Sequence, residues 1–342
     1  MTDRPADKTV PSLGAARPST FSVVIPVRPT ESPSRAIESL KKVSYPGELF
    51  EVLVIPGRRP SRQRNLGVRA ARGEIIYFLD NDSQATPALF ETALACFDDE
   101  RVAGAGGPNV AVPPSCLVEA ISERVLTSPL GTAKIQARYK PVGKKRTATE
   151  RDLILCNLAI RKRVLEEVGG IDEKLYPNEE NELISRIVSE PYSYRFVYSP
   201  DLVVLRKRPS SLYGYFRTIF GYGRGRVQQT LTRPKLNSLQ HFLPLLFLLY
   251  VISVPFLGSV WAWLPLGLYG LAVLAASVGF AVREKRPVAL PLGVLMLAGT
   301  HAAYALGMLW GFLSAPWRER LPPQDEYKVK HVKTFDGWID DN

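Results

Sequence analysis

Two aspartates, Asp80 and Asp82, stand one residue apart directly after the apolar run Ile75–Leu79. A short, continuous apolar run is typical of a buried strand, so both carboxylates are expected at its carboxyl end. Hard divalent cations such as Mg²⁺ take oxygen ligands and keep positions open for substrate phosphates. The pair could hold such an ion against a diphosphate, or it could belong to an ordinary turn, where Asp and Asn are common.

Residues 21 to 205 alternate apolar runs with helical patterns, and these elements must position the two aspartates. The runs typical of buried strands are Phe21–Pro26, Val52–Ile55, Ile75–Leu79 and Val102–Ala105. Helical spacing occurs between them, at Ala36, Ile37, Leu40 and Val43, and again at Leu89, Phe90, Ala93, Leu94 and Phe97. This repetition predicts an α/β domain with a mixed, mostly parallel sheet, in which ligands bind outside the carboxyl ends of the strands.

The formal net charge is +11, from 44 Lys and Arg residues against 33 Asp and Glu residues. A basic chain favours anionic partners, namely nucleic acid, phosphorylated substrates or an anionic membrane surface. The sequence contains no helix-turn-helix, RNA-binding or zinc-finger signature, so nucleic acid is not expected. The three cysteines have no CxxC spacing and the three histidines are far apart, which argues against a disulfide framework and a clustered histidine metal site.

A composition break near Lys235 separates this domain from a strongly apolar region. From Leu236 to Val282 the chain has no Asp, Glu, Lys or Arg, and a bilayer core takes about 20 apolar residues per helix. Two spans are therefore expected, with Trp261 and Trp263 at the membrane interface between them. A second uncharged run, Pro287–Trp317, predicts a third span or a re-entrant segment. Buried core helices of a soluble protein are the alternative.

Basic clusters at Arg224–Lys235 and Arg283–Arg286 flank the apolar region, and both are expected in the cytoplasm. The first twenty residues lack an apolar stretch, so no secretory signal peptide is expected there. These patterns divide the chain into a disordered leader at 1–20, an α/β catalytic domain at 21–209, an amphipathic interfacial segment at 210–235, a membrane region of two or three helices at 236–317 and a polar tail at 318–342.

The segment before Asp80 supports the interpretation of Asp80 and Asp82 as ligands of a divalent cation. It runs Arg62-Gln63-Arg64-Asn65-Leu66-Gly67, then Gly73-Glu74, the apolar strand and Asp80-Asn81-Asp82. This order resembles family 2 glycosyltransferases, whose pattern is Ala-Arg-Asn-x-Gly, a short helix, Gly-Glu, a strand and Asp-x-Asp. Gln63 replaces the Ala, and the other positions match. The resemblance implies a GT-A fold, Mn²⁺ or Mg²⁺ at Asp80 and Asp82, and a nucleotide-sugar site that includes Arg64, Asn65 and Asp80.

Two later segments extend the resemblance to about residue 230. Asn157-Leu158-Ala159-Ile160-Arg161, followed by Gly169-Gly170-Ile171-Asp172-Glu173, is similar to a family segment that places Asn157 near the acceptor. Asn178-Glu179-Glu180-Asn181-Glu182-Leu183 resembles Gly-Glu-Asp-x-Glu-Leu, whose Asp is the family's general base. Glu180 takes that position, and Glu179 is expected beside it at the acceptor. The alternative is an acidic helix start, which the helix dipole favours.

Three departures from the family pattern concern the donor and the metal. After the second strand the acid that reads the nucleobase is absent, and the chain has Gly57 and Arg58 instead. Both are expected in the nucleotide-sugar site, with Arg58 at the diphosphate. The loop after the first strand is also divergent, and Pro26, Arg28 and Glu31 are expected at the donor. Arg206 stands where many relatives have a His, so a third metal ligand is lost.

Together these patterns predict an inverting, metal-dependent glycosyltransferase at the cytoplasmic face of the inner membrane. It would move a sugar from a nucleotide-sugar donor to a lipid-linked or glycan acceptor, with Glu180 as the base that deprotonates the acceptor hydroxyl. The alternative is a non-catalytic nucleotide-sugar-binding or scaffold protein on a degenerate copy of the same fold. The missing loop acid, the missing His and the change from Asp to Glu motivate that alternative.

Overall fold

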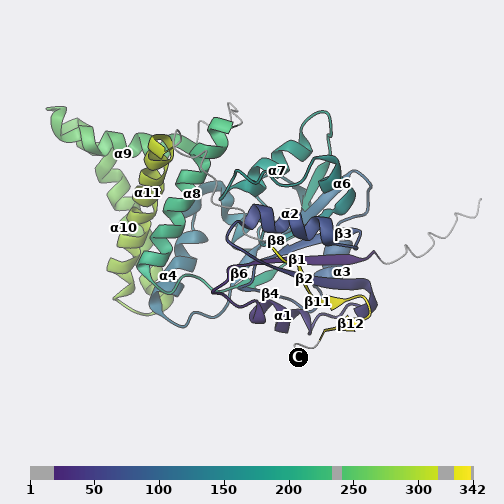
Figure 1. The fold of residues 1–342 in the computed structure, drawn as a ribbon. Helices are drawn as coiled ribbons and strands as arrows, with labels where there is room; N and C mark the ends of the chain where they lie inside the picture. The colour runs from purple at the N-terminus through teal and green to yellow at the C-terminus, as the bar shows by residue number, and fades with distance from the viewer. Residues whose placement is uncertain (1–18, 233–240, 315–326, 340–342) are drawn as a thin grey trace, which may run out of the picture.

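Within the residues that the structure describes, a mixed sheet of nine strands forms the centre of the protein (Figure 1). The structure is a computed structural model and describes residues 19–232, 241–314 and 327–339. The strand order is β12-β11-β2-β1-β3-β8-β5-β9-β7. The bounds are β1 Phe21–Val27, β2 Phe50–Pro56, β3 Ile75–Leu79, β5 Val102–Gly106, β7 Arg146–Ala148, β8 Asn157–Arg161, β9 Arg195–Tyr198, β11 Lys330–Thr334 and β12 Gly337–Trp338.

The apolar runs expected as strands are present as β1, β2, β3 and β5. β1 lies between β2 and β3, and both pairings are parallel. β8 then joins antiparallel between β3 and β5, which makes the sheet mixed. Every residue of β1 is buried, as expected for a strand that is covered on both faces. The carboxyl ends of β1, β2 and β3 therefore meet at one edge of the sheet.

Helices cover both faces of this sheet (Figure 1). α2, α6 and α7 contribute to the core on one face, and α1 and α3 contribute to the core on the other. α1 and α3 match the two helical patterns that the sequence predicts. The bounds are α1 Ser34–Leu40, α2 Pro60–Ala70, α3 Leu89–Leu94, α6 Lys162–Glu167 and α7 Glu179–Val188, with a 3₁₀ turn η1 at Gly47–Leu49.

A second sheet of three strands brings Arg206 to the edge where β3 ends. β10 (Val204–Arg206) pairs antiparallel with β4 (Ser83–Ala85) and parallel with β6 (Asn109–Ala111). In this register Arg206 lies opposite Ser83, the residue that follows Asp82. The small sheet therefore joins two segments that are far apart in the chain.

A layer of helices stands beside the α/β domain (Figure 1). α8 occupies the segment expected to be amphipathic and packs along α11, which also contacts α4, α9 and α10. The bounds are α4 Leu117–Leu126, α5 Pro129–Thr132, α8 Leu212–Thr232, α9 Leu243–Ser253, α10 Leu264–Glu284 and α11 Ala289–Ser314, with 3₁₀ turns η2 Ala133–Arg138, η4 Val254–Phe256 and η5 Val260–Trp263.

Two helices among the described residues are long and apolar enough to cross a membrane, Val260–Glu284 and Ala289–Ser314. The apolar helix before them, Leu243–Phe256, is shorter. The two spans expected before Val282 are thus one short and one long helix, and the turn expected at the tryptophans is present as η5. Large apolar side chains remain exposed along α9, α10 and α11, which leaves this layer with an uncovered apolar face.

The C-terminal tail returns to the α/β domain. β11 pairs antiparallel with β2, and β12 pairs with β11. Lys333 is buried in this pairing, and its Nζ donates to the carbonyl oxygen of Phe50 at 2.7 Å. The tail, expected only to be polar, therefore lies on the same side of any membrane as the sheet that it joins. The leader expected at 1–20 falls almost entirely outside the described residues, which begin at residue 19.

Two glycines allow α8 and α11 to approach each other closely. A Cβ at Gly223 would lie 2.0 Å from the carbonyl oxygen of Tyr304, and a Cβ at Gly307 would lie 2.1 Å from that of Phe220. Backbone atoms cannot move aside as a flexible side chain can. Gly221, on the same helix, has no atom within 4 Å of its Cβ position.

We expect Gly223→Ala to destabilise the protein by about 1–3 kcal/mol, because the added methyl forces the two helices apart. Gly221→Ala is the matched control and should stabilise by up to about 1 kcal/mol, since Ala has the higher helix propensity. Thermal unfolding of the detergent-solubilised chain measures both. Equal melting temperatures for the two variants would show that α8 and α11 are not in this contact.

Candidate active site

Arg206 bridges the two aspartates that follow β3. Its Nη1 lies 3.3 Å from Asp80 Oδ2, and its Nε lies 3.1 Å from Asp82 Oδ2. Burial lowers the pKa of Arg206, but the two aspartates outweigh burial and hold this pKa well above its ordinary value. The residue that replaces the family's His is therefore a permanent cation in contact with both expected metal ligands.

Arg64 forms a second bridge, from the middle of α2. Its Nη2 lies 2.9 Å from Asp80 Oδ1, and its Nη1 lies 2.7 Å from Glu179 Oε1. The Arg64 and Glu179 side chains are 6% and 4% exposed, so water does not screen this pair. Burial, together with the adjacent Glu180, raises the pKa of Glu179 to about 7 against the attraction of Arg64. Glu179 therefore holds a proton more readily than an exposed glutamate does.

Glu180 lies in the first turn of α7 and faces a different arginine. Its Oε1 accepts a hydrogen bond from Arg138 Nη1 at 3.2 Å. Arg138 also donates to the side-chain oxygen of Asn181 and to the carbonyl oxygen of Glu150. α7 begins after Asn178, whose φ of 83° lies in the left-handed region that Asn tolerates better than most residues. The neighbouring carboxylates of Glu179 and Glu180 therefore contact two different arginines, Arg64 and Arg138 respectively.

Several polar atoms of this cluster are buried without a hydrogen-bond partner among the described residues. They are Arg64 Nε, Asp82 Oδ1 and Glu179 Oε2. Buried polar atoms are almost always paired in folded proteins, and exceptions require a reason. Hydrogen-bond donors and acceptors that lack partners in one cluster are suited to a polar ligand that forms the missing hydrogen bonds.

Asp80 and Asp82 fit a hard divalent cation by the chemistry of their oxygens, and Asp82 Oδ1 is one of the open atoms. Arg206 competes for the Oδ2 atoms of both aspartates, and Arg64 holds Asp80 Oδ1. Among the described residues no group of three or more His, Cys, Asp and Glu side chains is placed to hold a metal. An ion at this position would therefore depend on two protein carboxylates, with the remaining ligands supplied by water or phosphate.

Four of the residues expected at the nucleotide-sugar donor, Arg28, Glu31, Gly57 and Arg58, lie in the loops after β1 and β2. Arg28 and Glu31 form an exposed ion pair of 3.3 Å. Glu31 Oε2 also accepts a hydrogen bond at 3.2 Å from the side chain of Asn81, which ties this loop to the turn that carries Asp80 and Asp82. Gly57 donates its backbone N–H to the last residue of β1. Arg58 is exposed beside it, and Pro26 is buried within β1.

Two asparagines expected at the site have structural positions instead. Asn65 uses its side chain to hold the backbone of Ile171, donating to the carbonyl at 2.8 Å and accepting from the N–H at 2.9 Å. Asn157 is fully buried, and its side chain bonds to Tyr77 and to the carbonyl oxygens of Pro108 and Leu202. It has no exposed atom for the acceptor contact expected of it.

Arg138 and Tyr327 were not expected near the site. Arg138 ends a 3₁₀ turn, and no motif surrounds it in the sequence. Tyr327 comes from the tail and lies over the loop after β2, where a Cβ at Gly57 would be 2.0 Å from its ring. The guanidinium of Arg62 lies 5.2 Å from the centre of the same ring. The tail therefore borders the loop that lacks the family's base-reading acid.

Comparison with known proteins relates the segment that carries this site to one family. Residues 28–169 match the family described as glycosyl transferase family 2. Over 165 residues the chain is 28% identical to the succinoglycan biosynthesis protein ExoA of Rhizobium meliloti (strain 1021). That match covers 47% of this chain and 46% of ExoA, so it spans about half the length of the relative.

The fold resembles the mannosyltransferase PcManGT of Pyrobaculum calidifontis, solved in complex with GDP-Man and Mn²⁺. The TM-score is 0.51 at 18% identity, and the similarity covers 86% of this chain and 88% of that one. The mixed sheet, the helices on both of its faces and the matched motifs agree with the GT-A fold of this class. Residues 28–169 therefore resemble a glycosyl transferase family 2 domain, and the fold around them is that of GT-A proteins.

Proposed function

We propose that this protein transfers a sugar from a nucleotide-sugar donor to a lipid-linked or glycan acceptor at the cytoplasmic face of the inner membrane. The observation that carries the proposal is the cluster of four carboxylates and three arginines, with polar atoms left open, at one edge of a family 2 domain. The carboxylates supply acid–base and metal-binding oxygens, and the arginines supply positive charge for a diphosphate.

Glu180 is the proposed base. It lies beside the bridge from Glu179 through Arg64 to Asp80, and Arg138 fixes its Oε1. A carboxylate oriented in this way can accept the proton of an acceptor hydroxyl as that oxygen attacks the anomeric carbon. Direct attack opposite the leaving nucleoside diphosphate inverts the configuration at that carbon. Glu179, whose pKa lies near neutral pH, is the proposed contact for the acceptor.

The leaving diphosphate is proposed to meet Arg206, Arg64 and the exposed Arg58. Arg206 already carries its charge at the carboxylates where the phosphates are expected. Mn²⁺ or Mg²⁺ bound to Asp80 and Asp82 would neutralise charge that develops on the leaving group. Arginine contacts to phosphate are charge-assisted and frequently bidentate, so the guanidinium groups also orient the donor.

Membrane attachment is proposed to occur through the exposed apolar face of α9, α10 and α11. Trp261 is 77% exposed at one end of the long apolar helix, and Glu284 at the other end pairs with Arg124 of α4 at 2.7 Å. Because α4 follows β6 in the chain, this contact supports the proposal that the basic end at Arg283–Arg286 lies on the cytoplasmic side, where basic flanks are favoured. α11 begins there, and the tail after it rejoins the sheet, which supports a re-entrant or interfacial placement of α11.

We expect Glu180→Gln to lower turnover by about 10²–10⁴-fold with little change in donor binding, because it removes the base but keeps the size of the side chain. A transfer assay measures this directly. Glu166→Gln removes one exposed carboxylate from α6 and should retain full activity. Full activity in Glu180→Gln together with loss in Glu179→Gln would move the base to Glu179. If the wild-type chain turns over no donor, the scaffold alternative is favoured.

We expect Arg206→His to raise Mn²⁺ affinity by roughly tenfold or more. The change removes a positive charge whose repulsion with a divalent ion at about 4 Å is on the order of 8 kcal/mol at an effective dielectric of 20, and it adds a nitrogen ligand. Titration of free Mn²⁺ by electron paramagnetic resonance measures the affinity. Arg195→His, at an exposed ion pair with Asp99, is the matched control and should not change it. Equal affinities for the two variants would place the ion away from Asp80 and Asp82.

A further inference from the structure

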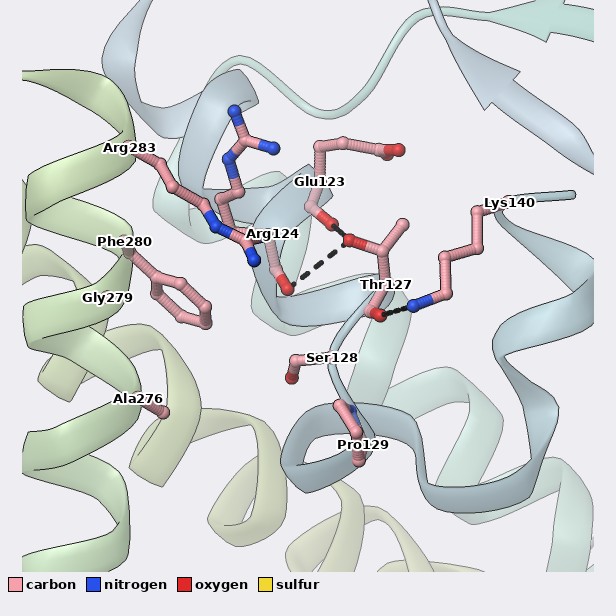
Figure 2. Close-up of a pocket in the computed structure, with 10 residues that line it drawn as sticks. All are labelled: Glu123, Arg124, Thr127, Ser128, Pro129, Lys140, Ala276, Gly279, Phe280 and Arg283. Atoms are coloured by element: carbon pink, nitrogen blue, oxygen red, sulfur yellow. Dashed lines mark hydrogen bonds between the residues drawn. The ribbon is translucent and has the colours of Figure 1, made fainter. Parts of the chain in front are cut away.

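A cavity of about 530 Å³ lies where α4 and α10 meet, outside the site described above. α4 and the loop after it form one wall through Arg124, Thr127 and Ser128, and the last turns of α10 form the opposite wall. Figure 2 shows Arg283 reaching from α10 toward the α4 backbone, while Lys140 enters from the opposite side. This volume falls within the range of protein sites for small ligands.

The cavity carries an excess of positive charge. Lys140 Nζ donates to the carbonyl oxygen of Thr127 at 2.7 Å, so its charge has no carboxylate partner within the described ranges. Arg283 likewise forms no ion pair with any residue that the structure describes. The acidic side chains nearby are already paired, because Glu123 contacts Arg208 at 2.7 Å and Glu284 contacts Arg124 at 2.7 Å. Two uncompensated cations therefore face one cavity, which favours an anionic ligand.

The wall that α10 contributes is apolar. Ala276, Gly279 and Phe280 line the cavity, and Phe280 points into it (Figure 2). The outward-facing residues Val278 and Val282 on the same turns are 45% and 70% exposed and belong to the uncovered apolar face of the helical layer. A ligand with an anionic head and a hydrocarbon chain matches both parts, since its chain can lie against the apolar side chains of α10.

An ion pair joins the rim of the cavity to the segment that follows β10. Glu123 on the rim pairs with Arg208, which lies two residues beyond Arg206, the last residue of β10. Two residues of extended chain span at most about 7 Å. The rim of the cavity is therefore in contact with the segment that carries Arg206 to the aspartates.

We propose that this cavity binds the phosphate group of a membrane lipid through Arg283 and Lys140, with the lipid chain lying along α10. Two sources share this chemistry: the phosphate of a lipid-linked acceptor, which rests on the proposed function, and the head group of an anionic phospholipid of the bulk membrane. Guanidinium and ammonium groups at the border of an apolar helix are the groups that bind such phosphates.

The test measures binding of soluble lipid analogues to the full chain in a non-ionic detergent. Farnesyl phosphate should raise the melting temperature of the wild-type chain, because a ligand that binds the native state stabilises it. Farnesol, which lacks the phosphate, should raise it less. Arg283→Gln and Lys140→Gln should each weaken farnesyl phosphate binding by roughly tenfold or more, the range for loss of one charge-assisted hydrogen bond. Lys285→Gln, a neighbouring exposed cation outside the cavity, should bind as the wild type does.

Short-chain phosphatidylglycerol separates the two sources. Binding of farnesyl phosphate alone supports the acceptor, and equal binding of phosphatidylglycerol supports a bulk phospholipid. Equal binding by the wild type and both cavity variants, or equal shifts with farnesol and farnesyl phosphate, would overturn the phosphate site. Hydrolysis of the nucleotide sugar in the same preparations tests the proposed function separately. Lipid binding without donor turnover would leave the phosphate site standing while the transferase proposal fails.

Discussion

The need to neutralise buried carboxylates determines how this site is built. Arg64, with its side chain 6% exposed, holds Asp80 on one side and Glu179 on the other. Removing one partner of such a group strands a charge in a poorly hydrated place, which is strongly destabilising. The end of β3, the middle of α2 and the start of α7 must therefore keep their relative positions. Arg206 adds β10 to the same constraint through its contacts with both aspartates.

The predictable parts of this site are those in which a functional side chain lies close in the sequence to the strand or helix that positions it. Asp80 and Asp82 directly follow an apolar strand, and Arg64 lies in the helix before that strand. Local patterns were therefore sufficient to predict that the three residues lie at the same edge of the sheet. The contacts of Arg206 depend on the register of β10, and those of Arg138 depend on the packing of a 3₁₀ turn. Neither feature has a periodic signature, so sequence alone indicated only that a His was missing at 206.

Asn65 and Asn157 show why matching a motif does not assign a role. Both match family positions, but the amide of each is used by the fold. Asn65 holds the turn at Ile171, and Asn157 joins Tyr77 to two carbonyl oxygens below the sheet edge. The strand β11 was missed for a different reason: its residues are polar, and the burial of Lys333 depends on carbonyl groups that only the folded domain supplies. Apolar composition indicated the long helices but not the glycine contacts that set the spacing of α8 and α11.

The helical layer contacts the turn that carries the proposed base, Glu180. The side chain of Asn178, which precedes α7, donates to the carbonyl oxygen of Tyr222 on α8. A Cβ at Gly225 would lie 2.5 Å from the carbonyl oxygen of Pro177, so α8 presses on the turn that presents Glu179 and Glu180. The backbone of Glu150 holds Arg138, and its carboxylate lies 4.0 Å from Arg226 of α8. A shift of α8 would therefore move both the turn that carries Glu180 and the arginine that orients it. Since α8 packs along α11, the same contacts that attach the apolar layer to the domain also fix the geometry of the base.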